Sequence, residues 1–238
     1  AVHVAGSIPA FVDLMNQKAA SLGMSNTHFM NPHGVQDDNH YTTARDMAKL
    51  MVYALQNETF CEVDATKTYT GPATNLTPEP RVLNTTNRLL RRLEGDTIDT
   101  TYPYAVGGKT GDTDAAGKCL VAVAERDGAR VIIVLFGDRI EMYNNDKELN
   151  NLSRFINAKN IFEYIFENEF ATVTGAELGL PTAFSVSIPN ADATDLPGGL
   201  LPVTADLSAV SLRASSAAIA NYKNNVSAIQ TNVEPLDT

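Results

Sequence analysis

Apolar side chains recur at helical spacing in three parts of the chain. The three sets are Phe11, Leu14, Met15, Ala19 and Leu22; Met47, Leu50, Met51, Ala54 and Leu55; and Leu152, Phe155, Ile156, Phe162, Ile165 and Phe166. Steps of three and four residues place such side chains on one face of an α-helix. Ser7 and Thr43 precede the first two sets as candidate N-caps, and Gly23 follows the first as a stop signal. The pattern predicts three amphipathic helices.

Two β-rich apolar runs lie in the middle of the chain. They span residues 118–125 and 130–136, and the turn Arg126-Asp127-Gly128-Ala129 joins them. An Asp-Gly pair between such runs is a strong hairpin signal. Residues 108–113 lie just upstream and are expected to add a third strand. The sequence therefore predicts a three-stranded antiparallel sheet with the last of the three helices packed on it, which makes the fold class α+β.

The remaining segments carry weaker patterns. Residues 66–99 are rich in Pro and Thr and are expected to form an irregular connection, with room for one helical turn. After about residue 170 the composition changes to Ala, Ser, Thr, Val and Pro, with short alternating runs such as 184–189. We therefore expect a main domain over residues 1–170 and a small β-rich appendage, incomplete in its strands, over residues 171–238.

Composition narrows the classes of function. The net charge of −10 argues against a nucleic-acid partner, because binding to phosphates depends on clusters of Lys and Arg. The chain contains no run of eighteen apolar residues and no basic, apolar leader at its start, so we expect a soluble chain. Two cysteines are too few for a disulfide-stapled framework.

The segment from Val106 to Gly117 carries the candidate chemistry. It sets Lys109-Thr110-Gly111 among glycines, immediately before the predicted hairpin. Lys-Thr-Gly is one of the three signatures of the penicillin-recognising serine acyltransferases, beside a Ser-x-x-Lys nucleophile and a Ser-x-Asn element. Taken alone, the tripeptide would more often be an ordinary polar turn, so its neighbours decide its meaning.

Five segments together give that context. They read FVDLMNQKAASLGM, FMNPHGVQDDNHYTTARDMAKLM, NTTNRLL, GGKTGDTDAAGKCLVAVAERDG and RFINAKNIFEYIF. In order and spacing they resemble the D-alanyl-D-alanine carboxypeptidases, the low-molecular-mass penicillin-binding proteins of peptidase family S11. The resemblance covers residues 1 to about 170, and the tail is similar to the second domain of that family. It implies a β-lactamase/transpeptidase-like antiparallel sheet packed with helices.

The resemblance also implies an activity and its residues. Lys109 corresponds to the catalytic motif lysine, while Thr110, Gly111, Asp112 and Arg139 correspond to substrate-binding positions. The family removes the terminal D-alanine from peptidoglycan pentapeptide stems through an acyl-enzyme, and β-lactam antibiotics acylate it. No metal or organic cofactor is implied. The expected location is the cell envelope, outside the cytoplasmic membrane, with any membrane anchor lying beyond Thr238.

Two departures from the family pattern change this picture. Asp112 puts a negative charge beside a site for an anionic carboxylate, which is unfavourable unless a cation offsets it. In addition, the chain contains no Ser-x-x-Lys and no Ser-x-Asn, and the family places both before the part that matches Ala1. We therefore expect this chain alone to be inactive. A non-catalytic peptidoglycan-binding or scaffold relative and a β-lactamase-like hydrolase remain as alternatives.

A metal site is the competing interpretation of the histidines. His28, His33 and His40 lie near Asp37 and Asp38, but their spacing is not that of a zinc protease. Histidines with hydrogen-bond partners inside a structural loop are the better expectation.

Overall fold

The computed structural model describes residues 1–138, 146–178, 183–187, 200–204 and 211–225. These residues belong to two compact units. The first comprises residues 1–126 and 130–164, and the second comprises residues 127–129 and 165–238. Each unit is described below by itself.

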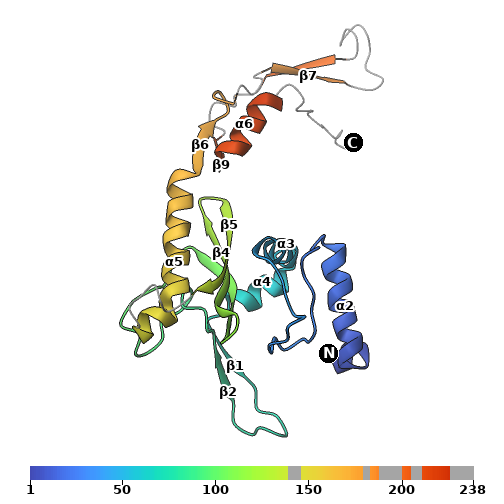
Figure 1. The fold of residues 1–238 in the computed structure, drawn as a ribbon. Coiled ribbons are helices and arrows are strands. Elements are labelled where there is room, and N and C mark those ends of the chain that lie inside the picture. The colour runs from blue at the N-terminus through green and yellow to red at the C-terminus, as the bar shows by residue number, and fades with distance from the viewer. Residues whose placement is uncertain (139–145, 179–182, 188–199, 205–210, 226–238) are drawn as a thin grey trace. The chain divides into compact units, whose positions relative to one another are not determined.

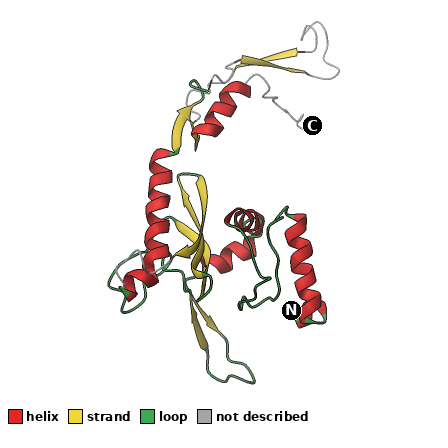
Figure 2. Cartoon of the chain, viewed as in Figure 1, coloured by secondary structure: helices red, strands yellow, loops and turns green. Residues whose placement is uncertain are grey.

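Four helices precede the sheets of the first unit (Figures 1 and 2): α1 (Val2–Ala5), α2 (Ile8–Ser21), α3 (Ala44–Ala54) and α4 (Glu58–Ala65). The hydroxyl of Ser7 accepts the N–H of Ala10, and that of Thr43 accepts the N–H of Asp46, so both predicted N-caps are confirmed. Helix α4 was missed because its eight residues are too few for a clear apolar stripe.

The predicted antiparallel sheet is confirmed. It contains β3 (Ala105–Thr113), β4 (Gly117–Arg126) and β5 (Ala129–Asp138), in the order β3-β4-β5. Asp127 and Gly128 join β4 to β5 with φ angles of 52° and 80°. Positive φ at both central residues is the geometry that an Asp-Gly hairpin turn requires. The strand that carries Lys-Thr-Gly is therefore an outer strand of a sheet built largely from local signals.

The prediction of an irregular connection over residues 66–99 is wrong in part. Strands β1 (Thr68–Gly71) and β2 (Arg81–Asn84) form an antiparallel hairpin inside it. Every residue of the two strands except Gly71 is exposed. Strand patterns are recognised by alternation between a buried and a solvated face, and this hairpin has no buried face to create one.

Helices cover both faces of the sheet (Figure 1). On one face Val121 and Val123 of β4 pack against Met51 of α3. Because side chains alternate along a strand, the fully buried Leu120 and Ala122 point to the opposite face. There the first-unit part of α5 (Lys147–Asn168) buries an apolar stripe that comprises Leu152, Phe155, Ala158 and Phe162. The predicted helix on the sheet is confirmed. It supports β3 and β4 on the face opposite to α3.

The second unit is a small mixture of strands and one helix. Strand β6 (Phe170–Thr174) pairs with β9 (Ser211–Ser215), and β7 (Ala183–Ser187) pairs with β8 (Leu200–Thr204), both antiparallel. Strand β7 lies in the alternating run that predicted a strand, whereas α6 (Ser216–Asn225) was not predicted. Among the described helices of the chain, none is long and apolar enough to cross a membrane.

A buried carboxylate ties α3 to the loop that follows α2. Asp46 is 1% exposed, and its Oδ2 accepts the N–H of Asn26 and the hydroxyl of Thr27, each at 2.9 Å. Lys49 pairs with its Oδ1 at 3.2 Å. Burial opposes ionisation, yet the two donors and the Lys49 ammonium together hold the pKa of Asp46 below its ordinary value. Asp46 is therefore an ionised anchor of the helical part.

The Asp46 anchor predicts a specific dependence of stability on pH. Because the pKa is lower in the folded than in the unfolded chain, its contribution is present above the unfolded value and is lost as the pH falls through the folded value. We expect Asp46→Asn to lower the melting temperature at pH 7 by roughly 5 °C and to flatten the acid limb of a melting series from pH 7 to pH 2.5. The exposed Asp38→Asn is the control. An unchanged acid limb in Asp46→Asn would contradict the assignment.

Candidate active site

Strand β3 has an irregularity in its pairing just before Lys109. Ala105 is paired with Ala124, but Gly107 is paired with Val123, so one extra residue is inserted into β3. Gly108 follows with a φ of 141°, a conformation that strongly favours glycine. Bulges of this kind re-aim the side chains that follow them and are common next to active sites.

The carboxylate of Asp64, on α4, lies against this bulge. Its Oδ2 accepts the N–H of Gly108 at 2.6 Å, and a Cβ at Gly107 would stand only 2.3 Å from the same oxygen. The carboxylate is half-buried. Burial raises the pKa of Asp64 above its ordinary value of 3.8, against the opposing effects of the Gly108 N–H and the Lys109 charge. The missing side chain of Gly107 is thus what allows a helix carboxylate to reach the strand backbone.

Lys109 and Thr110 follow the bulge and line a pocket of about 500 Å³, which also contains Asp64, Tyr69 and Leu83. Lys109 is exposed, and its Nζ donates to the carbonyl of Thr110 at 2.5 Å. The two side chains are presented on an edge strand whose outer side is unpaired among the described strands. A lysine ammonium and a threonine hydroxyl therefore lie together on one edge strand.

A second threonine contacts the motif. Thr86, from the loop after β2, lies with its Oγ1 2.7 Å from Oγ1 of Thr110. Asn87, the next residue, is fully buried; its side chain donates to the carbonyl of Gly107 at 3.4 Å and accepts the N–H of Leu89 at 3.0 Å. The NTTNRLL segment thus packs along the inner part of β3 and brings a second hydroxyl to the site.

The charge of Asp112 has a cation beside it. Lys118, which is directly opposite on β4, forms an ion pair with Oδ2 of Asp112. The Asp112 side chain is 49% exposed and that of Lys118 is 18% exposed. The expected conflict between Asp112 and an anionic substrate is therefore reduced by a neighbour that the sequence alone did not identify.

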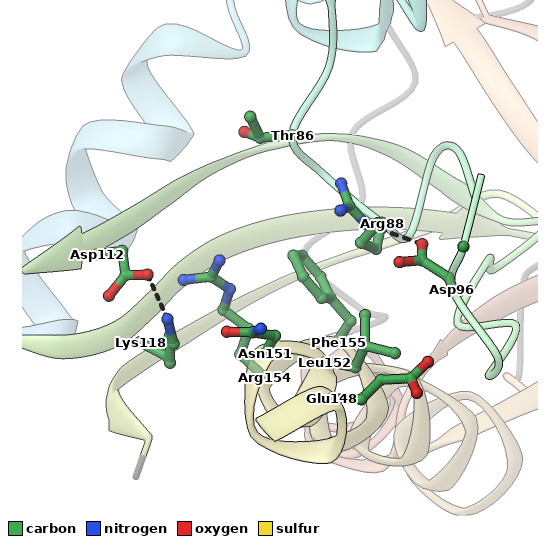
Figure 3. Close-up of a pocket in the computed structure, with 11 residues that line it drawn as sticks. Thr86, Arg88, Asp96, Asp112, Lys118, Glu148, Asn151, Leu152, Arg154 and Phe155 are labelled. Carbon is green, nitrogen blue, oxygen red and sulfur yellow. Dashed lines mark hydrogen bonds and ion pairs between the residues drawn. The ribbon is translucent and has the colours of Figure 1, made fainter. Parts of the chain in front are cut away.

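Arginine 154 supports the same strand from α5 (Figure 3). Its Nη1 donates to the carbonyls of Gly111 at 2.7 Å and Cys119 at 3.4 Å, which belong to paired residues of β3 and β4. Asp112, Lys118 and Arg154 together line a pocket of about 550 Å³ on the α5 side of the sheet. Arg154 is 9% exposed, so its hydrogen bonds to the paired residues Gly111 and Cys119, beside Asp112, are largely shielded from water.

The structure brings four of the five predicted site residues together. Lys109, Thr110, Gly111 and Asp112 are consecutive on β3, whereas Arg139 lies outside the described residues. The sequence interpretation missed Asp64, Thr86 and Arg154 as neighbours of the motif. Thr86 lies in the NTTNRLL segment and could have been identified from it. Asp64 and Arg154, however, reach β3 from more than forty residues away.

The histidines have partners in their own loop. His28 Nδ1 contacts the carbonyl of Asn39 at 2.8 Å, His33 Nδ1 accepts the N–H of Val35 at 3.2 Å, and His40 Nδ1 accepts the N–H of Met30 at 3.3 Å. Across the described residues, no group of three or more metal-binding side chains is close enough to hold an ion. The expectation of hydrogen-bonded loop histidines is confirmed.

Comparison with known proteins gives the same family as the motifs. Residues 1–140 match the peptidase S11 family, described as D-alanyl-D-alanine carboxypeptidase. The chain is similar to the D-alanyl-D-alanine carboxypeptidase DacF of Bacillus subtilis, with 37% identity over 137 residues, or 58% of this chain and 32% of that protein. It is also similar to a Streptomyces D-alanyl-D-alanine carboxypeptidase, with 36% identity over 55% of this chain and 43% of that protein. It therefore spans less than half the length of these relatives.

Solved structures resemble the fold as well. A crystal structure of a D-alanyl-D-alanine carboxypeptidase from Mycobacterium tuberculosis superposes with a TM-score of 0.57 and 29% identity, over 70% of this chain and 56% of that chain. The expected α+β fold, with an antiparallel sheet packed between helices, is thereby confirmed. Because the family match covers more than half of its residues, the chain belongs to the D-alanyl-D-alanine carboxypeptidase family, peptidase S11.

Proposed function

We propose that these residues supply the substrate-binding wall of a serine-type D-Ala-D-Ala carboxypeptidase, where the binding wall is Lys109 to Asp112 on β3. The supporting observation is that no other described strand pairs with the outer edge of β3, and that Lys109 and Thr110 on this strand line a pocket. An extended peptide can add to such an edge as a further strand, with backbone hydrogen bonds for affinity. The substrate is the pentapeptide stem of peptidoglycan, and β-lactam antibiotics occupy the same wall.

Each residue of the wall has a role in this proposal. Lys109 attracts the substrate carboxylate and favours proton loss from a serine hydroxyl. Thr110 donates to the terminal carboxylate; when Thr86 donates to Thr110, the Thr110 proton stays available for that purpose. Gly111 leaves room for the peptide, and the amide of Asp112 is one donor of the oxyanion hole. Arg139 is proposed as a second cation for the carboxylate.

The reaction needs a nucleophile that these 238 residues do not contain as Ser-x-x-Lys. In the complete reaction, a serine oxygen attacks the carbonyl of the penultimate D-alanine, and the C–N bond to the last D-alanine breaks. The freed amine takes a proton and leaves, and water later hydrolyses the acyl ester. We propose that sequence outside residues 1–238 supplies this serine and its lysine, and that the chain by itself is inactive.

The proposed setting follows from the substrate. Peptidoglycan lies outside the cytoplasmic membrane, so the protein is proposed to act in the cell envelope, associated with the membrane in its full-length form. Residues 1–170 form the proposed transpeptidase-like domain, which is partial here, and residues 171–238 form a β-rich second domain. Cell-wall assembly and cell shape are the processes that such trimming serves.

A second candidate rests on the same missing nucleophile. A relative that kept the binding wall but lost the chemistry would bind peptidoglycan stems as a scaffold. The reading frame upstream of Ala1 separates the two candidates, because the enzyme requires Ser-x-x-Lys and Ser-x-Asn there. A β-lactamase-like hydrolase would instead be recognised by rapid deacylation of its penicilloyl enzyme.

The proposal predicts the outcome of labelling with a fluorescent penicillin. The 238-residue chain is expected to give no labelled band after denaturing electrophoresis, because it has no motif nucleophile to form the ester. The same chain, extended by the sequence that its gene encodes upstream of Ala1, is expected to give one. A labelled residue mapped within 1–238 would contradict the first expectation, and an unlabelled extended protein would favour the scaffold.

The ion pair of Asp112 and Lys118 predicts a double-mutant result in the extended protein. Lys118→Gln leaves the Asp112 charge near the bound carboxylate, and we expect the second-order rate of penicillin acylation to fall by roughly 3- to 10-fold, a Coulomb effect of about 1 kcal/mol. Adding Asp112→Asn to Lys118→Gln should restore most of the rate. If both variants acylate at the wild-type rate, the pair has no role in offsetting charge at the wall.

A further inference from the structure

Asp64 is a carboxylate at the wall to which neither the motif nor the family match gives a role. It comes from α4, which the sequence pattern did not reveal, and it lines the same pocket as Lys109 and Thr110. Its Oδ2 accepts the N–H of Gly108, the residue immediately before Lys109. The position of Asp64 therefore affects the backbone position from which the Lys109 side chain extends.

The contact between Asp64 and Gly108 is specific because the surrounding backbone has no room for a side chain at Gly107 or Gly108. A Cβ at Gly108 would lie 2.3 Å from the carbonyl oxygen of Val121, and a Cβ at Gly107 would lie 2.3 Å from Asp64 Oδ2. The bulge is thus pressed between β4 on one side and the α4 carboxylate on the other. A hydrogen bond between an amide and a carboxylate is among the stronger kinds, so Asp64 is suited to hold this geometry.

The carboxylate also contributes charge to the pocket. The titratable side chains that line this pocket with Asp64 are Lys109 of β3 and Tyr69 of β1, and only Lys109 is a cation. Lys109 is exposed and donates to its own strand at the carbonyl of Thr110. A fixed negative charge on the α4 side favours an ammonium that stays near the bulge.

We propose that Asp64 is a positioning residue for Lys109: it anchors the bulge through the Gly108 amide and keeps the lysine ammonium over the pocket by charge. It touches the strand and acts through Lys109, so it is not a catalytic residue. This inference rests on the proposed function only in its second half, because the anchoring of Gly108 does not depend on any reaction.

The anchor is tested on the 238-residue chain by amide hydrogen exchange and NMR. Asp64→Ala should speed the exchange of the Gly108 amide by roughly tenfold or more, whereas Asp64→Asn, whose amide oxygen can still accept, should stay close to wild type. The exposed Glu62→Ala on the same helix is the matched control. Unchanged exchange of Gly108 in Asp64→Ala would overturn the anchor.

Acid titration tests whether the group that contacts the Gly108 amide is the ionisable carboxylate of Asp64. Burial raises the pKa of Asp64, so the Gly108 amide proton should shift with a midpoint above 3.8, and the shift should be absent in Asp64→Asn. An equal shift in the Asn variant would assign the titration to another group.

The charge role is tested in the extended protein through penicillin acylation. Asp64→Asn should lower the second-order acylation rate by roughly fivefold or more while its melting temperature and Gly108 exchange stay near wild type, and Glu62→Gln should change none of these. A wild-type rate in Asp64→Asn would overturn the charge role. If penicillin fails to acylate the wild-type extended protein, the proposed function falls, and the exchange of Gly108 still decides the anchor.

Discussion

At Gly108 the backbone of β3 comes so close to β4 that no side chain fits between them. A Cβ there would lie 2.3 Å from the Val121 carbonyl oxygen and 2.9 Å from Ala122 Cα, far inside van der Waals contact. The same step carries the extra residue of the bulge and the N–H that Asp64 accepts. The direction in which Lys109 and Thr110 leave the sheet depends on this approach, because they follow it directly along β3.

The rest of the first unit keeps this strand in place from both faces. On one face α3 packs Met51 against Val121 and Val123. On the other, α5 places Arg154 under the carbonyls of Gly111 and Cys119. Binding an extended peptide at a strand edge needs a rigid edge, since every residue that must be ordered on binding reduces affinity. The two helices thus support β4 and β3 from opposite faces of the sheet.

The parts that the sequence predicted are those with local signals. The caps Ser7 and Thr43 bond to residues three positions away, and the Asp127-Gly128 turn sets its own dihedral angles. Lys109 to Asp112 could be assigned because the four residues are contiguous. In each of these cases, the physics that fixes the structure acts within a few residues.

The parts that were missed depend on contacts between distant residues. Asp64 is 44 residues from Gly108, and Arg154 is 43 residues from Gly111, so no spacing rule connects them. The β1-β2 hairpin exposes nearly all its side chains and leaves no alternation to detect. Identifying the cation that offsets the Asp112 charge required the strand register, because Lys118 becomes the neighbour of Asp112 only when β3 pairs with β4.

The most direct measurement compares the melting temperatures of Gly108→Ala and Gly111→Ala in the 238-residue chain. A Cβ at Gly111 would meet only the Cβ of Cys119, at an ordinary 3.4 Å. If the close approach at Gly108 organises the strand, Gly108→Ala lowers the melting temperature by on the order of 5 °C or more, while Gly111→Ala stays near wild type. Equal and small effects of the two substitutions would contradict the central role given to the Gly108 step.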